Sequence, residues 1–363
     1  MPCLAGIGVD RAMNESVREA GRHGYIACYA AEFEASGPLD ADAYAKVLMP
    51  AFDFEGPAGS ADQTFAASTE LFFLPDLTVS WARITASRFT RTIRTIAARG
   101  TDQVLVVGYR SGYFDMTVGG QTKRVEAGEF AFIDLSQEVM IEAPRVDTIS
   151  IAISRRKLEA MVPLLDLAHG FVRPRDTVSD LLLGMLEGIV AAGPNMAVVD
   201  ARGVAVAVLQ LVAASLEPLS RQGLETSQGR RAVSPVEIKA FIEQHLLEPA
   251  LGPQTLLDAF NVTRSTLYRM FEPLGGVSAY ISQRKLNHAF RQLSDTQQTR
   301  KRISKLATEL GFSHPSAFTR AFKDAFGLSP KDVQVLAEQS REQEVQLLVS
   351  PEPLQYLRPI TRD

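Results

Sequence analysis

The sequence predicts a multidomain α and β protein: an N-terminal β barrel with flanking helices, followed by a C-terminal all-α domain. Short apolar runs separated by turn residues occupy about residues 70–155, as in a small barrel or sandwich. From about residue 234 the apolar residues recur with helical spacing instead. A polar stretch with two glycines, residues 219–233, separates the two patterns, and we expect a linker at 221–233. A chain of 363 residues has room for two domains.

The N-terminal strands are predicted from β-branched runs and from alternation. Phe114, Met116 and Val118 alternate with polar residues up to Gly119-Gly120, a hairpin turn, after which the strand pattern resumes. The first 65 residues are expected to pack on the barrel. The other predicted strands lie at 104–107, 122–125, 130–133, 139–141 and 149–153.

Residues 155–218 carry apolar clusters typical of helices, including Leu181, Leu182, Met185 and Leu186. They offer more apolar surface than one pair of helices can bury alone. Two uses stay open, because the helices could pack on the barrel or form a dimer interface. They complete an expected N-terminal domain of residues 1–220.

The C-terminal domain, residues 234–340, is expected to begin with a capped helix. Ser234 can cap the N-terminus of this helix, Pro235 suits its first position and Glu237 its third.

This domain is basic. Residues 261–331 hold twelve Lys/Arg and four Asp/Glu, a net +8, whereas the whole chain carries −4 and the remainder therefore −12. Such asymmetry is typical of a protein of which one part meets a polyanion, although a merely solvated basic face is the alternative. Residues 341–363 would form a tail.

The same domain contains a weak internal repeat. Residues 255–280 superpose on 304–330 with an offset of 50 residues, which becomes 51 after the turn. Each copy has a short apolar helix, a tight turn at Asn261 or Gly311, and a second helix that ends in Phe271 or Phe322. A helix-turn-helix needs this arrangement, and its second helix presents a polar face to a DNA major groove. A generic helical hairpin is the alternative.

Residues about 234–338 resemble the double helix-turn-helix domain of the AraC/XylS family of bacterial transcription regulators. The strongest match is the run GFSHPSAFTRAFK at 311–323, closing with FGLSP at 326–330, and 262–271 and 303–307 add to it. Leu257 and Asn261 depart from the alanine and glycine usual in the family, and the proline expected after Ser278 is absent.

The resemblance implies two recognition helices, joined by a long helix near 277–293, that enter successive major grooves. Arg269 and Arg320 are the strongest candidates for base contacts, because arginine can donate two hydrogen bonds to guanine. Lys323, Arg300 and Lys301 are expected to contact phosphates. By position, the DNA-reading residues would be Arg264, Ser265, Tyr268 and Arg269 in the first helix, and His314, Pro315, Ser316, Thr319 and Arg320 in the second.

The usual partner domain in this family is a cupin-like barrel, and residues 70–155 are similar to it, chiefly at 128–136 (GEFAFIDLS). Cupin metal sites need several histidines, and none of the five lies within 70–155, so no metal is expected. Phosphate-loop and serine-nucleophile motifs are also absent, and Cys3 and Cys28 precede the barrel. We therefore expect no catalytic residue and no cofactor.

The barrel is interpreted instead as a sensor for a small organic effector, an aromatic compound or a carboxylate. The candidate contacts combine aromatic walls with cationic ends. Most such residues on strands serve as core or as solvated surface. The candidates are Trp81, Arg83, Tyr109, Arg110, Tyr113 and Phe114.

Together these patterns predict a cytoplasmic, sequence-specific transcription regulator, an activator, whose partners are double-stranded DNA, the effector, RNA polymerase and a second copy of the chain. No run of 18 or more uncharged apolar residues and no secretory signal occurs, so we expect no membrane partner. An enzyme with an accessory DNA-binding domain is the alternative.

Overall fold

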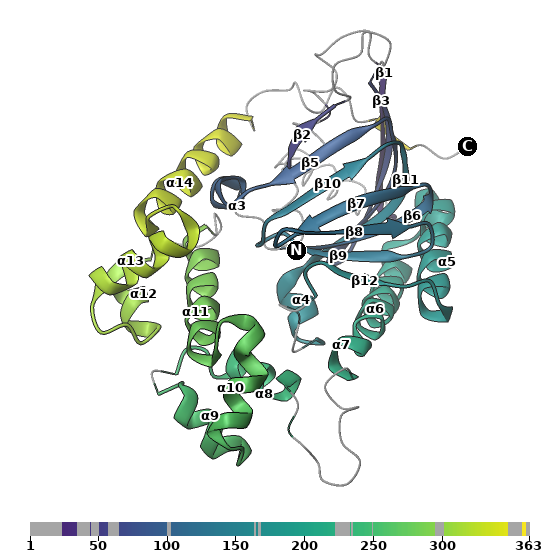
Figure 1. Cartoon of the computed structure of the whole chain (residues 1–363). Coiled ribbons are helices and arrows are strands. Elements are labelled where there is room, and N and C mark those ends of the chain that lie inside the picture. The colour runs from purple at the N-terminus through teal and green to yellow at the C-terminus, as the bar shows by residue number, and fades with distance from the viewer. Residues whose placement is uncertain are drawn as a thin grey trace.

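The computed structural model describes residues 24–34, 44, 51–56, 65–99, 103–162, 165, 168–221, 233, 235–248, 250–294, 301–347 and 358–360. The predictions that concern residues 1–23, most of the linker, the Ser234 cap and Arg300 lie outside these ranges. The described chain forms a β-rich lobe from its N-terminal part and a helical lobe from its C-terminal part (Figure 1).

Two antiparallel sheets build the β-rich lobe. The larger has eight strands in the order β12-β9-β6-β11-β4-β3-β1-β13, and the smaller has five in the order β2-β5-β10-β7-β8. The strands are β1 (Ala27–Glu34), β2 (Asp53–Glu55), β3 (Ala66–Leu74), β4 (Leu77–Ile84), β5 (Ser87–Arg91), β6 (Gln103–Ser111), β7 (Tyr113–Val118), β8 (Gln121–Glu126), β9 (Phe130–Asp134), β10 (Val139–Ala143), β11 (Val146–Ser154), β12 (Phe171–Arg173) and β13 (Arg358–Pro359).

The predicted strands are confirmed, and the turn chemistry explains the clearest of them. Gly119 and Gly120 have φ of 57° and 75°, the left-handed values that a two-residue hairpin turn requires, so β7 folds back directly onto β8. The strands begin earlier than the predicted barrel, because β1 pairs with β3 and β2 pairs with β5.

The larger sheet separates two hydrophobic cores. Successive side chains of a strand point to opposite faces, so on β4 Ala82 and Ile84 face the smaller sheet whereas Leu77 and Val79 face helices. The helices on that second face are α4 (Arg155–Glu159), α5 (Thr177–Ala192), α6 (Val198–Ser215) and α7 (Glu217–Arg221), with a short 3-10 turn at Gly193–Asn195.

Helices α5 and α6 pack one face on the larger sheet, with Leu182, Leu186 and Val208 fully buried there. Their outer faces leave Leu181, Val199 and Val206 exposed by 58%, 80% and 55%. By length and composition alone, two helical segments could cross a membrane, Thr177–Asn195 and Val198–Leu219. Core helices of soluble proteins meet the same criterion, so this composition is weak evidence for a membrane span.

The helical lobe contains both predicted helix-turn-helix units. In the first, Asn261 ends α9 with φ 49°, and in the second Gly311 follows α12 with φ 78°, so the turn residues adopt the expected left-handed conformation. The helices are α8 (Pro235–Gln244), α9 (Pro253–Phe260), α10 (Arg264–Phe271), α11 (Val277–Ser294), α12 (Ile303–Glu309), α13 (Pro315–Phe326) and α14 (Pro330–Leu347), with a 3-10 turn at Glu272–Leu274.

Helix α3 and strand β13 were not predicted, and neither were β1, β2 and β12, the last of which interrupts the stretch 155–218 that was expected to be helical. Helix α3 (Ile93–Arg99) follows β5 and lies between the lobes, where Ile96 and Ala97 join the core of α11 to α14 (Figure 1). Strand β13 comes from the predicted tail and pairs with β1, with Pro359 opposite Tyr29. The C-terminal segment therefore returns to the edge of the larger sheet.

Candidate DNA-binding surface and effector cavity

The two predicted recognition helices, α10 and α13, bury their apolar side and expose their polar side. Leu267 and Phe271 fix α10, and Phe318 and Phe322 fix α13, all without solvent exposure. Of the ten predicted contact residues, nine are exposed and Thr319 is half-buried. The exposed nine are Arg264, Ser265, Tyr268, Arg269, His314, Pro315, Ser316, Arg320 and Lys323.

Local contacts order the first helix and its reading face. The Thr263 hydroxyl accepts a hydrogen bond from the Thr266 amide and caps α10. The Arg264 guanidinium lies 5.5 Å from the centroid of the Tyr268 ring, close enough for a cation–π contact. In α13, Pro315 occupies the first turn, and the Thr319 hydroxyl donates to its carbonyl oxygen at 2.9 Å. Because its hydroxyl proton is engaged in this way, Thr319 can offer DNA mainly its hydroxyl oxygen as a hydrogen-bond acceptor.

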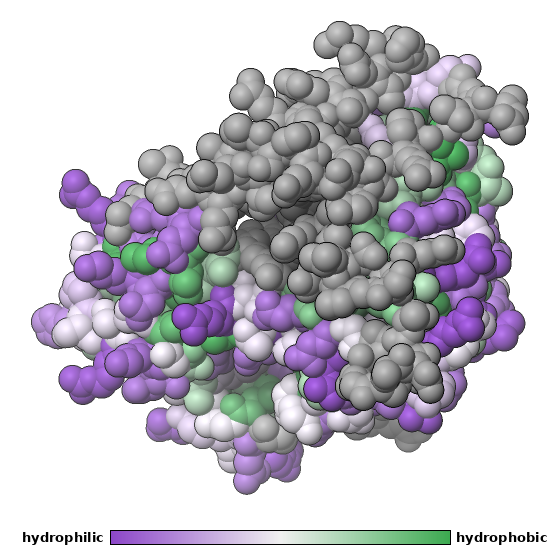
Figure 2. Space-filling model, turned by 90° about the horizontal axis from the view of Figure 1, so that it is seen from above, coloured by the Kyte–Doolittle hydropathy of each residue, from purple (hydrophilic) through white to green (hydrophobic). Residues whose placement is uncertain are grey.

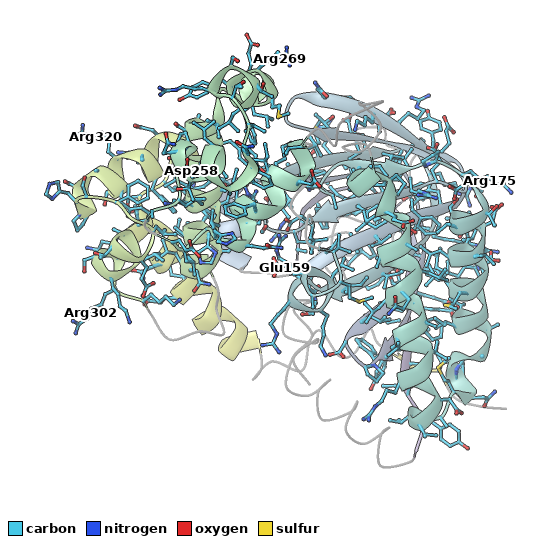
Figure 3. The ribbon with its side chains drawn as sticks, turned by 90° about the horizontal axis from the view of Figure 1, so that it is seen from below. Glu159, Arg175, Asp258, Arg269, Arg302 and Arg320 are labelled. Carbon is cyan, nitrogen blue, oxygen red and sulfur yellow. The ribbon has the colours of Figure 1, made fainter. Side chains whose placement is uncertain are left out.

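Both arginines that the sequence favours project outward from the helical lobe. Figure 3 shows both at its outer edges, Arg320 on the side far from the β-rich lobe and Arg269 at the top. The helical lobe also has a largely hydrophilic outer surface, seen on the left of Figure 2. The geometry thus leaves the polar faces of α10 and α13 free for a large polyanion.

Some of the positive charge counted in this segment is structural. Arg284 is buried and its Nε donates to Glu243 Oε1 at 2.5 Å, which ties α11 to α8. Lys285 is buried as well, and the Lys301 amine donates to the Gln292 side chain. The net +8 therefore overstates the charge that faces DNA, and Lys301 belongs in part to the packing of its own lobe.

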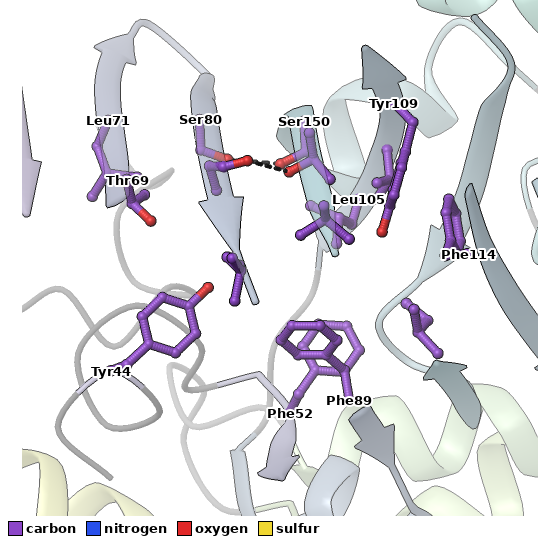
Figure 4. Close-up of a pocket in the computed structure, with 16 residues that line it drawn as sticks. Tyr44, Phe52, Thr69, Leu71, Ser80, Phe89, Leu105, Tyr109, Phe114 and Ser150 are labelled. Atoms are coloured by element: carbon purple, nitrogen blue, oxygen red, sulfur yellow. Dashed lines mark hydrogen bonds between the residues drawn. The ribbon is translucent and has the colours of Figure 1, made fainter. Parts of the chain in front are cut away.

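A cavity of about 100 Å³ lies between the two sheets of the β-rich lobe (Figure 4). Its walls are mostly apolar, and its polar groups are hydroxyls, including those of Tyr44, Tyr109 and Thr69. Ser80 and Ser150 hydrogen-bond to each other at 2.7 Å on one side. The lining consists of Tyr44, Phe52, Thr69, Leu71, Ser80, Ala82, Ile84, Phe89, Leu105, Val107, Tyr109, Phe114, Ile141, Val146, Thr148 and Ser150.

The hydroxyls of this cavity are neutral and within reach of a guest. Burial raises the pKa of both the Tyr44 and the Tyr109 phenol, so both keep their protons at neutral pH. The buried Thr69 hydroxyl lies beside that of Tyr44 without the geometry of a full hydrogen bond. Tyr109 stacks on Phe114, with ring centroids 4.5 Å apart. None of the described lining residues carries a charge.

Two of the predicted effector contacts, Tyr109 and Phe114, line the cavity, and Trp81, Arg83 and Arg110 do not. Alternation is the reason, because Trp81 and Arg83 follow Ser80 and Ala82 on β4 and point to the opposite face. There both guanidinium groups lie 4.9 Å from the Trp81 ring centroid.

The group around Trp81 holds α5 on the sheet. Trp81 Nε1 donates to Asp147 Oδ1 at 2.7 Å, and Arg110 Nε donates to Glu187 of α5 at 2.9 Å. Tyr113, the remaining candidate, lies under the Arg124 guanidinium at 3.9 Å and also outside the cavity lining.

Within the described residues no group of three or more His, Cys, Asp or Glu is placed to hold a metal ion.

Sequence reasoning missed Tyr44, Phe52 and Phe89 as cavity residues. Phe89 shares the buried face of the short strand β5 with two polar residues, Ser87 and Arg91, so the sequence showed no apolar alternation there. Tyr44 stands outside the strands, and its position depends on packing against Phe33, Phe54 and Phe65.

Comparisons with known proteins identify similar chains. Residues 256–334 match a helix-turn-helix domain family. The transcriptional activator NphR from Rhodococcus is 25% identical over 262 residues, which cover 70% of this chain and 76% of that protein.

Among solved structures, the AraC-like transcriptional activator CuxR aligns with a TM-score of 0.49 and 21% identity, over 72% of this chain and 94% of that one. ToxT from Vibrio cholerae aligns with a TM-score of 0.36 and 9% identity, over 86% and 98%. The helix-turn-helix match and the similarity to NphR confirm the resemblance that the sequence predicts: the chain is a helix-turn-helix transcription regulator that is similar to AraC-like proteins.

Proposed function

We propose that this chain is a cytoplasmic transcription activator controlled by a small, uncharged organic effector held in the cavity of the β-rich lobe. The observation that carries the proposal is the cavity, which is apolar, lined by neutral hydroxyls and placed between the two sheets. Such a site, mainly apolar with a few polar groups, suits a small ligand. The similarity to the activator NphR supports activation rather than repression.

The lining argues for a neutral guest. A carboxylate buried here would need a cationic partner, because burial of an unpaired charge costs far more than burial of a hydroxyl. The cationic candidates Arg83 and Arg110 lie on the other face of the sheet, where each contacts Trp81. The Tyr44 and Tyr109 phenols can both donate and accept, so they suit a hydroxyl, carbonyl or nitro group on the ligand.

The size of the cavity favours a compact guest. An engineered cavity of roughly 150 Å³ holds one benzene ring, so a cavity of about 100 Å³ accepts one substituted ring only with a small shift of its walls. Phe52 and Phe89, whose ring centroids are 6.2 Å apart, form one wall of the cavity. Long-chain and fused-ring ligands would need a much larger rearrangement.

Thermal unfolding of the full chain with three matched probes tests the proposal. At pH 7, 4-methylphenol is neutral, 4-methylbenzoate is anionic and 4-methylbenzylamine is cationic. We expect 4-methylphenol to raise the melting temperature and the two ions not to. Val107→Phe, which fills the cavity, should abolish the shift, whereas Arg110→Ala on the opposite face should preserve it.

The outcomes separate the parts of the proposal. A shift with 4-methylbenzoate that Val107→Phe removes would refute the uncharged class but keep the cavity as the effector site. If none of the three probes binds, or if Val107→Phe leaves binding intact, the cavity is not the effector site. A gel shift with and without the bound probe then shows whether occupancy changes affinity for DNA.

For DNA recognition, we propose that the exposed polar residues of α10 and α13 read the target, with Arg269 and Arg320 on guanines and Lys323 on a phosphate. We further propose that the chain acts without enzymatic activity, as a homodimer that contacts RNA polymerase. The exposed apolar residues on α5 and α6 support a dimer interface there, and Val199→Lys should then lower the mass seen by analytical ultracentrifugation to that of a monomer.

A further inference from the structure

Helix α3 belongs by sequence to the β-rich lobe and by packing to the helical lobe. Its Ile96 and Ala97 are buried in one core with Leu286 and Phe290 of α11 and Val333 of α14. A helix of seven residues is too short to be stable in isolation, so this packing is what keeps it helical. Helix α3 therefore completes the core of the second helix-turn-helix unit.

The other end of α3 continues directly from the cavity wall. Strand β5 carries Phe89, which lines the cavity, and two residues later Arg91, whose Nε donates to the Leu135 carbonyl oxygen at 2.6 Å. One residue separates β5 from α3. Only three residues therefore separate Phe89 from α3: the half-buried Thr90, the buried Arg91 and the half-buried Thr92.

Two further contacts tie α3 to elements that flank the cavity. The Thr95 hydroxyl donates to Asp53, the neighbour of the cavity residue Phe52. The Ile93 amide donates to Glu138 Oε1 at 2.9 Å, just before β10, which carries the cavity residue Ile141. Helix α3 is therefore held by three segments that border the cavity, at β2, β5 and β10.

The linker helix α11 meets the β-rich lobe at a second place. Arg291 of α11 is attracted by Asp134 and Glu159 of that lobe and repelled by Arg155, and Glu159 lies between the two lobes in Figure 3. Because α11 joins the two helix-turn-helix units, its seating on the β-rich lobe fixes how α10 and α13 are presented.

We infer that α3 couples the cavity to the DNA-binding lobe: occupancy that displaces the wall of Phe52 and Phe89 changes the seating of α3 on α11 and α14. This inference rests on the proposed function in one respect only, which is that the cavity is the effector site. In physical terms, α3 is packed in the core of the helical lobe and is tied by hydrogen bonds to segments that border the cavity, so both sites can bias its position.

Hydrogen exchange of the full chain tests the coupling without any ligand or known operator. Two matched variants change the cavity wall by the same substitution: Phe89→Leu on β5, which leads into α3, and Phe114→Leu on β7, which does not. A third variant, Ile96→Ser, weakens the docking of α3. Peptides from β6 and β11 report in every sample whether the β-rich lobe stays folded.

We expect Phe89→Leu to accelerate exchange in α11 and α14 at least about fivefold, and Phe114→Leu to leave it within about twofold. Ile96→Ser should accelerate the same peptides, and Phe89→Leu should add nothing in that background. The inference is overturned if the two phenylalanine variants act alike, if Phe89→Leu has no effect, or if Ile96→Ser leaves α11 and α14 protected. None of these results depends on whether 4-methylphenol binds, so the failure of the proposed function would be seen separately.

Discussion

The buried pair of Asp134 and Arg155 offers the most quantitative test of how the β-rich lobe is held together. Both side chains are only 2% exposed, and the Arg155 guanidinium donates to Asp134 Oδ2. Asp134 also accepts from the Ser136 amide at 2.9 Å, the Ser136 hydroxyl at 2.7 Å and Gln137 Nε2 at 3.0 Å. The second partner of Arg155 is the half-exposed Glu159, at 2.8 Å.

Asp134→Asn removes the charge and keeps the shape. Breaking a buried ion pair on one side costs roughly 3–5 kcal/mol, because the remaining charge stays buried. Glu159 still partly compensates Arg155, so we expect about 3 kcal/mol less free energy of unfolding. Urea denaturation of the full chain, followed by circular dichroism, measures it.

Asp115→Asn is the matched control, because Asp115 pairs with Arg124 at 2.9 Å on the exposed hairpin of β7 and β8. Its expected cost is below about 1 kcal/mol. Replacing both buried partners, as Asp134→Leu with Arg155→Met, should recover most of the stability. A loss below about 1 kcal/mol for Asp134→Asn, or no difference from Asp115→Asn, would refute the reasoning.

The pH dependence of the same pair has a definite sign. Burial alone would raise the pKa of Asp134, but Arg155 and the hydrogen bonds of Gln137 and Ser136 outweigh it and hold that pKa below its usual range. The stabilisation is therefore fully present above the unfolded value of 3.8 and is lost as the pH falls below it. The penalty of Asp134→Asn should stay constant between about pH 5 and 8 and shrink at lower pH.

Two further predictions concern the helical lobe. Arg320→Ala should weaken binding to a DNA site selected from a random pool by about 1–3 kcal/mol and relax specificity at one position, whereas Arg175→Ala, 68% exposed on the β-rich lobe, should not; equal effects in a salt-matched gel shift would exclude base reading by Arg320. Burial and the charges of Arg291 and Lys301 lower the pKa of His288 to about 4, so its stabilisation is complete above about pH 6.5 and is lost as the pH falls toward 4. His288→Gln should therefore reduce the change in melting temperature over this pH range. An unchanged dependence of the melting temperature on pH would contradict the lowered pKa of His288.

The sequence predicts those parts of the fold that local chemistry decides. The glycine pair at 119–120 specifies a hairpin, and Asn261 and Gly311 specify the helix-turn-helix turns, because each adopts a backbone conformation that few residues tolerate. The polar faces of α10 and α13 follow equally from helical periodicity.

The effector cavity could be predicted only in part. Period-two alternation shows that Trp81 and Arg83 share one face of a strand, but it does not show which face looks into the cavity. The larger sheet is buried on both sides, so aromatic side chains occur on both faces. Helix α3 has a capping residue, since the Thr95 amide donates to the Thr92 hydroxyl at 3.2 Å, but its seven residues are too few to show a helical period. Its structure depends on a core formed by residues about 190 to 240 positions away.

That shared core limits how far the two lobes can be treated as interchangeable parts. A chimera joined at the linker, with the helical lobe of this chain behind a foreign sensor, would lack Ile96 and Ala97 and leave an apolar groove between α11 and α14 open to water. The transferable unit is therefore discontinuous: Pro235–Leu347 together with a graft of Ile93–Arg99. An engineer who exchanges sensors in this protein has to carry α3 across with the DNA-binding lobe.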